Sequence, residues 1–201
     1  MVKKEKLIAY FGFGTNRDLE MMEHMVGRQD IKGEHGKLPG YEITIQRADQ
    51  FRNEIIPTSP NQKFSPKDLI MNGWGPKFEM FTSRPNPNGM IYGTIWYITP
   101  AELELVREWE IVDFGCQEDA YGIAITDDGR RVKVITQSFL KPAEIDRVIT
   151  GDDYEPYIWD KKAMLKRADD IRNDYLKMKS TFPKEKREAI DKFIQNLTAK
   201  I

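Results

Sequence analysis

Residues 10–16 of this chain, with the sequence YFGFGTN, are well suited to bind a small anion. The glycines at 12 and 14 can adopt backbone angles that are closed to other residues, and they let a ligand approach the main chain. The apolar residues before this segment predict a strand, and the pattern after it predicts the start of a helix. Because N–H groups at a helix start attract anions, we expect this loop to hold a carboxylate, carbonyl or phosphate oxygen.

Glu110 is the second residue whose setting could support chemistry. Residues 99–102 read TPAE, a threonine cap, a proline at the first helical position and a capping-box glutamate. The pattern predicts a helix over 100–110, in which Leu103, Val106 and Glu110 share the apolar face because they are spaced i, i+3, i+7. The opposite face is expected to be solvated and carries Glu104, Arg107 and Glu108.

A carboxylate at this place is in an unfavourable setting. Burial disfavours the charged form, and so does the negative end of the helix dipole, so both should raise the pKa of Glu110. A general base that works near neutral pH benefits from a pKa raised in this way. The alternative is that the helix ends one residue earlier and Glu110 turns into water.

The composition excludes several classes of partner. The chain has 201 residues with 31 basic and 32 acidic side chains, so its net charge of −1 gives no reason to expect nucleic acid or an anionic membrane surface. The apolar run at 7–14 is too short to cross a bilayer. Cys116 is the only cysteine and His24 and His35 are the only histidines, which rules out an internal disulfide and a histidine-rich metal site. We expect a cytoplasmic protein without a metal site.

The elements that must position the loop and Glu110 are mostly strands followed by helices, which favours an α+β fold. Thr15 followed by Asp18 is expected to cap the helix after the loop. Residues 59–75 are interpreted as a long surface loop, and 84–89 as a turn between two strands. Strands are predicted at 6–13, 41–46, 77–82, 90–98, 121–126 and 131–140, and helices at 17–25, 100–110, 143–149, 160–179 and 183–201.

The loop, the glutamate and the residues between them resemble the γ-glutamylcyclotransferase-like family. That family has a loop like Y-F-x-Y-G-S-N, a strand like G-x-V-W and a helix that ends in a segment like L-D-x-x-E. Here the loop is residues 10–16, the strand is Gly93-Thr94-Ile95-Trp96, and the helix end is residues 106–110. A tyrosine that begins a later strand pair is similar to Tyr121, and one that closes the family domain is similar to Tyr157.

The resemblance implies a small mixed β-barrel of about six strands with surrounding helices, over residues 1–157. Residues 158–201 lie outside it, as a helical C-terminal extension packed on the domain. These helices could also form a contact between two copies of the chain, so a homodimer stays open.

The resemblance also implies a reaction. The family cyclises a γ-glutamyl group to 5-oxoproline and releases an amine or amino acid, so a small γ-glutamyl compound is the expected partner. It implies that Glu110 is the catalytic acid and base and that no cofactor takes part. The substrate-binding residues carried over are Tyr10, Phe13, Gly14, Thr15, Asn16, Tyr121 and Tyr157.

Four departures from the family pattern leave other functions open. Phe13 lacks a tyrosine hydroxyl, Thr15 replaces serine, Arg107 replaces aspartate, and Ile111 stands where glycine is common. The same fold could therefore serve as a binding or interaction protein without catalysis. A dinucleotide site is a weaker alternative, because the two loop glycines match half of G-x-G-x-x-G but the third position is arginine.

Overall fold

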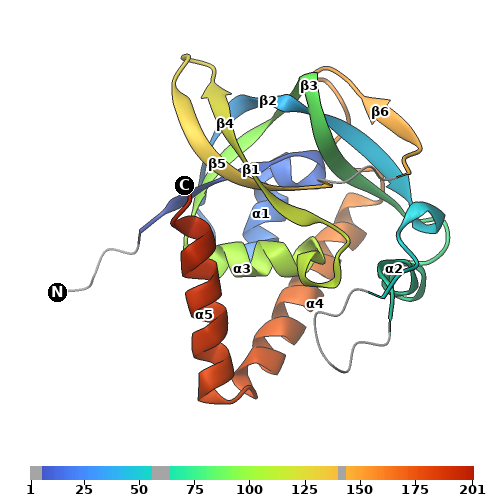
Figure 1. The fold of residues 1–201 in the computed structure, drawn as a ribbon, viewed down its shortest axis with the longest axis vertical. Helices are drawn as coiled ribbons and strands as arrows, with labels where there is room; N and C mark the ends of the chain where they lie inside the picture. The colour runs from blue at the N-terminus through green and yellow to red at the C-terminus, as the bar shows by residue number, and fades with distance from the viewer. Residues whose placement is uncertain (1–5, 56–63, 140–143) are drawn as a thin grey trace.

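The computed structural model describes residues 6–55, 64–139 and 144–201. Within these residues the helices gather on one side of a six-stranded sheet (Figure 1). The strands are β1 (Ile8–Gly12), β2 (Lys32–Arg47), β3 (Glu79–Ile98), β4 (Glu118–Thr126), β5 (Arg131–Ser138) and β6 (Arg147–Ile149). The helices are α1 (Leu19–Val26), α2 (Pro66–Gly73), α3 (Pro100–Trp109), α4 (Lys161–Ser180) and α5 (Lys184–Thr198).

Five of the strands close into a mixed barrel. The order is β3-β1-β5-β4-β2, and a long antiparallel pairing of β2 with β3 joins the two ends. Strand β1 is antiparallel to β3 and parallel to β5, while the short β6 adds to β2. The prediction of an α+β fold with a small mixed barrel of about six strands is confirmed.

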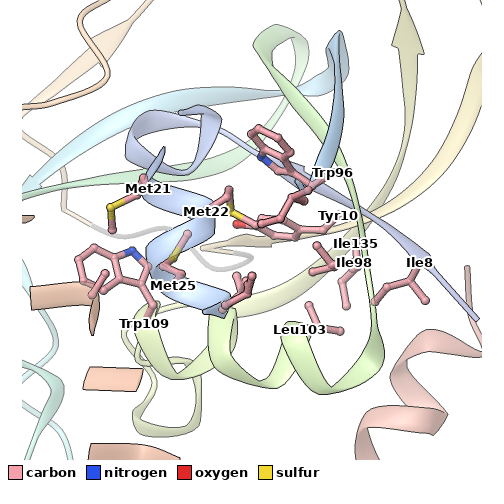
Figure 2. Close-up of a cluster of buried hydrophobic side chains, with 14 of the residues drawn as sticks. Ile8, Tyr10, Met21, Met22, Met25, Trp96, Ile98, Leu103, Trp109 and Ile135 are labelled. Atoms are coloured by element: carbon pink, nitrogen blue, oxygen red, sulfur yellow. The ribbon is translucent and has the colours of Figure 1, made fainter. Parts of the chain in front are cut away.

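Two apolar cores lie on the two sides of the barrel wall. Because side chains alternate along a strand, β1 sends Phe11 into the barrel and Tyr10 to the outside. The outer core lies between the barrel and the helices, where Tyr10 and Trp96 pack with the methionines of α1 (Figure 2). Strand β1 is therefore covered on both faces, as its nearly continuous apolar sequence predicts.

One long strand replaces the strand–turn–strand predicted at 77–98. Strand β3 runs through the predicted turn at 84–89, where Pro85 lies opposite Tyr41 of β2. The register shifts between Pro39 and Tyr41, around Gly40 with φ 86°. The proline- and asparagine-rich segment thus accompanies a bulge and does not reverse the chain. Strand β2 is also longer than the predicted 41–46.

Two further predictions were wrong. Helix α2 lies inside the region interpreted as a loop, and Ser65 and Asp68 form a capping box at its start. The same Ser-Pro-x-Asp signal stood in the sequence, but the eight-residue helix is too short to show a clear period. In the predicted helix at 143–149, residues 147–149 form β6, because they pair with β2; residues 140–143 lie outside the described residues.

The two C-terminal helices pack against α1 and α3 (Figure 1). They cover the face of α3 that was expected to be solvated. Glu104 and Arg107 are therefore buried and Glu108 is half-buried. Tyr175 and Lys179 of α4 bind the Glu104 carboxylate, the lysine at 2.7 Å. No helix in the described part of the chain is both long and apolar enough to cross a bilayer.

Candidate active site

Glu110 lies at the C-terminal cap of α3, facing the core. The predicted capping box of Thr99 and Glu102 is present and fixes the start of this helix. From that start, helical periodicity carries Glu110 onto the stripe of Leu103 and Val106, which are fully buried. Only 7% of Glu110 is exposed, so the alternative in which it turns into water was wrong.

A short chain of hydrogen bonds connects Glu110 to the N-terminal loop. The Asn16 side-chain amide donates to Glu110 Oε1 at 2.6 Å and to the Tyr10 hydroxyl at 2.8 Å. The amide of Gln117 donates to the other oxygen, Oε2. All four side chains are buried. The loop and the carboxylate, 94 residues apart in sequence, therefore belong to one polar cluster.

The electrostatics of this cluster favour a carboxyl that titrates near neutral pH. Burial raises the pKa of Glu110 from 4.5 to about 7, while the hydrogen bonds from Asn16 and Gln117 lower it. The cost of removing the charge from water is larger than the effect of the two donors. Glu110 can therefore both accept and return a proton near pH 7.

The loop glycines are required by close contacts. A Cβ atom on Gly12 would lie 2.2 Å from the Asn16 main-chain oxygen, which also accepts a hydrogen bond from Trp96 Nε1 at 2.7 Å. Gly14 has a φ of 57°, and a Cβ there would lie 2.7 Å from Phe81. Both positions therefore exclude a side chain, and together they turn Asn16 toward Glu110.

The helix after the loop is capped differently from the prediction. Asp18, and not Thr15, is the N-cap of α1, because its carboxylate accepts from the Met21 N–H at 3.0 Å. Residues Gly14–Arg17 form a 3-10 turn, in which the Thr15 hydroxyl donates to the Asn16 side-chain oxygen at 3.3 Å. The extra turn explains the difference, because it moves the start of α1 beyond Thr15.

A tyrosine that the sequence analysis missed lies against the loop. The Gly14 N–H donates to the Tyr154 hydroxyl at 3.0 Å, and this hydroxyl donates to the Tyr92 main-chain oxygen at 3.2 Å. The sequence signal was present, since Tyr154 and Tyr157 lie in one short segment. Only the folded chain shows which of the two reaches the loop.

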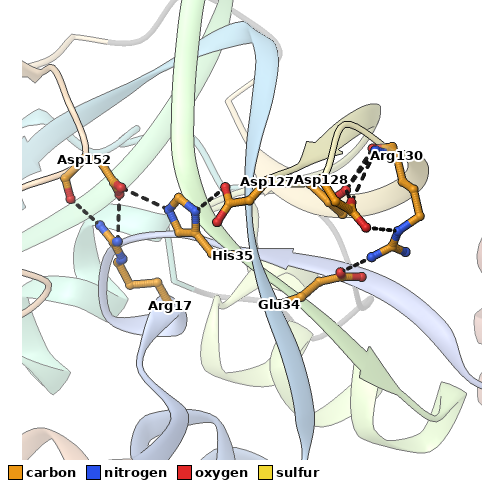
Figure 3. Close-up of polar contacts among 8 residues, drawn as sticks. Arg17, Glu34, His35, Asp127, Asp128, Arg130 and Asp152 are labelled. Atoms are coloured by element: carbon orange, nitrogen blue, oxygen red, sulfur yellow. Dashed lines mark hydrogen bonds and ion pairs between the residues drawn. The ribbon is translucent and has the colours of Figure 1, made fainter.

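Charged side chains hold the segment before Tyr154 in place (Figure 3). Arg17 donates to the main-chain oxygen and the carboxylate of Asp152, both at 2.8 Å. His35 lies between Asp127 and Asp152, at 2.8 and 3.0 Å, and the hydrogen bond to Asp127 is the main cause of its raised pKa. These contacts connect the loop, β2 and the β4–β5 turn.

A narrow cavity of about 40 Å³ lies where the loop meets the end of α3. Its size suits a few water-sized atoms. Both predicted halves of the site reach it, Phe13 and Thr15 from the loop and Glu110 from the helix. Much of the wall is aromatic, with Phe13, Trp74, Phe78, Trp109 and Trp159 among the lining residues.

The structure does not bring Tyr121 and Tyr157 to this cavity. The Tyr121 hydroxyl lies 3.5 Å from the Leu197 main-chain oxygen of α5, and Lys200 lies over its ring. Tyr157 packs near the start of α1, where burial and the nearby Asp18 carboxylate raise its pKa. Both tyrosines thus contact the C-terminal helices or α1.

Two glutamines were also missed. Gln117 and Gln137 are each only 1% exposed. The Gln117 Oε1 and both polar side-chain atoms of Gln137 bind no other described residue. Gln137 follows Ile135 by two residues in β5, so it lies on the face of the strand that carries the outer core. An isolated glutamine in a strand gives little signal in sequence, because its importance depends on what the fold packs over it.

No cluster of three His, Cys, Asp or Glu side chains that could share a metal ion occurs in the residues that the structure describes.

The comparisons with known proteins concern the fold. No protein-family model and no curated protein matches the sequence. An uncharacterized protein from Homo sapiens is 13% identical, with a TM-score of 0.52, over 92% of this chain and 87% of its own. A γ-glutamyl cyclotransferase is 12% identical, with a TM-score of 0.51, over 97% of this chain and 99% of its own. At such identities the likeness shows the fold alone, and this chain shares the fold of these two structures.

Proposed function

We propose that this protein is a γ-glutamylcyclotransferase-like enzyme that forms 5-oxoproline from a small γ-glutamyl compound. The observation that carries the proposal is the position of Glu110. Its carboxyl has a pKa of about 7, lines the same cavity as Phe13 and Thr15, and is hydrogen-bonded to Asn16 of the same loop. The fold shared with a γ-glutamyl cyclotransferase supports the proposal.

In the proposed reaction the α-amine of the γ-glutamyl group attacks its own γ-carbonyl carbon. A carbon–nitrogen bond forms and closes the five-membered ring, while the bond from that carbon to the leaving nitrogen breaks. Two protons pass from the attacking nitrogen, an ammonium at the start, to the leaving nitrogen. Glu110 is the group that accepts and returns them. Ring closure within one molecule needs mainly orientation, so no cofactor is invoked.

The loop would hold the oxygen atoms of the substrate. The donors would be the N–H groups of Gly14 and Thr15 and the Thr15 hydroxyl, as in an oxyanion site. The Asn16 N–H donates to the Phe13 main-chain oxygen at 3.1 Å. A substrate oxygen that binds the Gly14 N–H replaces the Tyr154 hydroxyl there. Tyr10 is 1% exposed and binds Asn16, so its part is to orient the amide that holds Glu110.

The test is Glu110→Gln, which keeps the size of the side chain and removes the base. We expect 5-oxoproline formation from a panel of γ-glutamyl compounds to fall at least about a thousandfold, the upper part of the range for general acid–base catalysis. The matched control is Glu108→Gln. Its carboxyl also has a pKa raised to about 7, but it lies on the other side of α3, outside the cavity. Full activity in Glu110→Gln would refute the mechanism.

A second candidate is a binding protein that uses the same site without catalysis. Phe13 and Arg107 favour it, because they replace the tyrosine and the aspartate of the family pattern. On this reading γ-glutamyl compounds raise the melting temperature without being consumed. If any of these compounds is converted to 5-oxoproline at a rate that depends on Glu110, the protein is an enzyme and not only a binding protein.

A further inference from the structure

We propose that the cavity selects γ-glutamyl amides whose released amine carries an apolar ring and no carboxylate. This inference rests on the proposed function and names its substrate class. It follows from the chemistry of the cavity wall, from the charges that line it, and from the direction in which the leaving group must point.

The wall beyond Glu110 is a set of packed aromatic rings. Trp74 stacks on Phe78 with ring centroids 4.5 Å apart, and Phe78 stacks on Trp159 at 5.8 Å. Trp109 meets Trp74 edge to face at 5.6 Å. All four side chains line the cavity. A ring inserted among them gains both buried apolar area and stacking geometry.

The charges at the wall are acidic. Among the described residues that line the cavity only Glu79 and Glu110 are ionisable, and no lysine, arginine or histidine lines it. The Glu79 carboxylate is paired with Arg147 at 2.9 Å. The carboxylate of a released amino acid would lie near Glu110 without a cation to pair with, and an unpaired charge in a dry pocket is costly. An amine without that carboxylate avoids the cost.

The geometry directs the leaving group toward the rings. The γ-glutamyl group must lie between the loop, at Phe13 and Thr15, and Glu110, which serves the leaving nitrogen. The lining residues that remain for the rest of the molecule are apolar or aromatic, apart from Glu79. A ring needs more than the 40 Å³ present, and Trp159 is the wall residue that can make room. Its side chain is 38% exposed and has one hydrogen bond, from Nε1 to the Glu79 main-chain oxygen at 3.2 Å.

The experiment uses four substrates that separate the ring from the carboxylate. They are γ-glutamyl-ethylamide, γ-glutamyl-alanine, γ-glutamyl-phenethylamide and γ-glutamyl-phenylalanine. The first pair lacks the ring and the second pair has it, and within each pair the substrates differ by one carboxylate. The measured quantity is kcat/KM for 5-oxoproline formation by the full chain.

We expect the ring to raise kcat/KM about tenfold to a hundredfold, the gain from burying an aromatic side chain. We expect the carboxylate to lower it about tenfold or more in both pairs. The phenethylamide is then the best of the four. The inference would be overturned if the ring did not raise kcat/KM. It would also be overturned if the γ-glutamyl amino acids reacted faster than the matching γ-glutamyl alkylamides.

Two variants test the walls directly. Trp159→Leu should lower the ratio of kcat/KM for γ-glutamyl-phenethylamide to kcat/KM for γ-glutamyl-ethylamide, and an unchanged ratio would overturn the inference. Arg167 lies over the Trp74 ring at 5.1 Å and does not line the cavity. Arg167→Gln should leave all four rates unchanged. A loss confined to the two carboxylate-bearing substrates would show that this arginine receives the carboxylate and would overturn the inference.

Binding separates this inference from the proposed function. Tryptophan fluorescence reports the cavity, because Trp74, Trp109 and Trp159 line it. If none of the four compounds yields 5-oxoproline, the enzyme proposal falls. The selectivity of the cavity still stands in that case if γ-glutamyl-phenethylamide binds at least about tenfold more tightly than γ-glutamyl-phenylalanine. If the compounds neither react nor bind, both proposals fall.

Discussion

Replacing Glu110 with glutamine should make the protein more stable above neutral pH and leave its stability nearly unchanged in acid. Folding raises the pKa of this carboxyl from 4.5 to about 7 because it is buried. The fold therefore favours the neutral form. The stability that this preference contributes is fully present below pH 4.5 and is lost as the pH rises through 7. One pKa unit corresponds to about 1.4 kcal/mol, so the loss between these values is about 3 kcal/mol.

The amide in Glu110→Gln cannot ionise, so it keeps the same stability over this range. It can also keep both hydrogen bonds. Asn16 still donates to the amide oxygen, and the Gln117 side chain can rotate so that its unpartnered Oε1 accepts from the new NH₂ group. The variant should therefore differ from the natural chain mainly in its pH dependence.

The assay is thermal unfolding of both proteins between pH 4 and pH 8. For a chain of this size 1 kcal/mol shifts the melting temperature by about 2–4 °C, so the variant should gain about 6–12 °C relative to the natural chain across the range. Glu108→Gln should show the same trend, because burial also raises the pKa of that carboxyl to about 7. A difference between Glu110→Gln and the natural chain that does not change with pH would show that Glu110 titrates as an ordinary carboxylate, and the reasoning would fail.

Two other substitutions test the contacts around α3. Gln117→Leu removes the hydrogen-bond donor to one Glu110 oxygen and so raises the pKa of the Glu110 carboxyl further. The acidic limb of the pH–rate profile for 5-oxoproline formation should therefore move up by about 1 pH unit. An unmoved limb would contradict the role of this donor. Lys179→Met leaves the buried Glu104 carboxylate without its cation and should cost about 3 kcal/mol of unfolding free energy in chemical denaturation. The exposed Lys177→Met on the same helix is its control, and an equal effect of both would refute the ion-pair argument.

Local signals predicted the parts of the fold that depend on a few neighbouring residues. The Thr99–Glu102 capping box and the apolar spacing of α3 placed Glu110 correctly, because a helix start and a 3.6-residue period determine which side chains share a face. The strands predicted at 121–126 and 131–140 likewise correspond to β4 and β5, which pair with each other.

The predictions failed where a distant part of the chain decides the outcome. The polar face of α3 looks solvated in sequence, yet α4 supplies Tyr175 and Lys179 as partners for Glu104, so the face is buried. Turn-forming residues at 84–89 lie within strand β3, because β2 pairs with Arg84 and Pro85 at their start and with Met90 after them. The substrate-binding roles of the loop residues, by contrast, are not decided by the fold and stay predictions.

The position of β1 has a consequence for the order of events during synthesis. This strand is made first, but its neighbours in the barrel are β3, which ends at Ile98, and β5, which begins at Arg131. The nascent chain must therefore carry an apolar strand with two open edges until β3 has been translated, and with one open edge until β5 follows. Barrel closure is then a late, long-range event, and we expect slow folding and a need for protection from aggregation while the polypeptide is still on the ribosome.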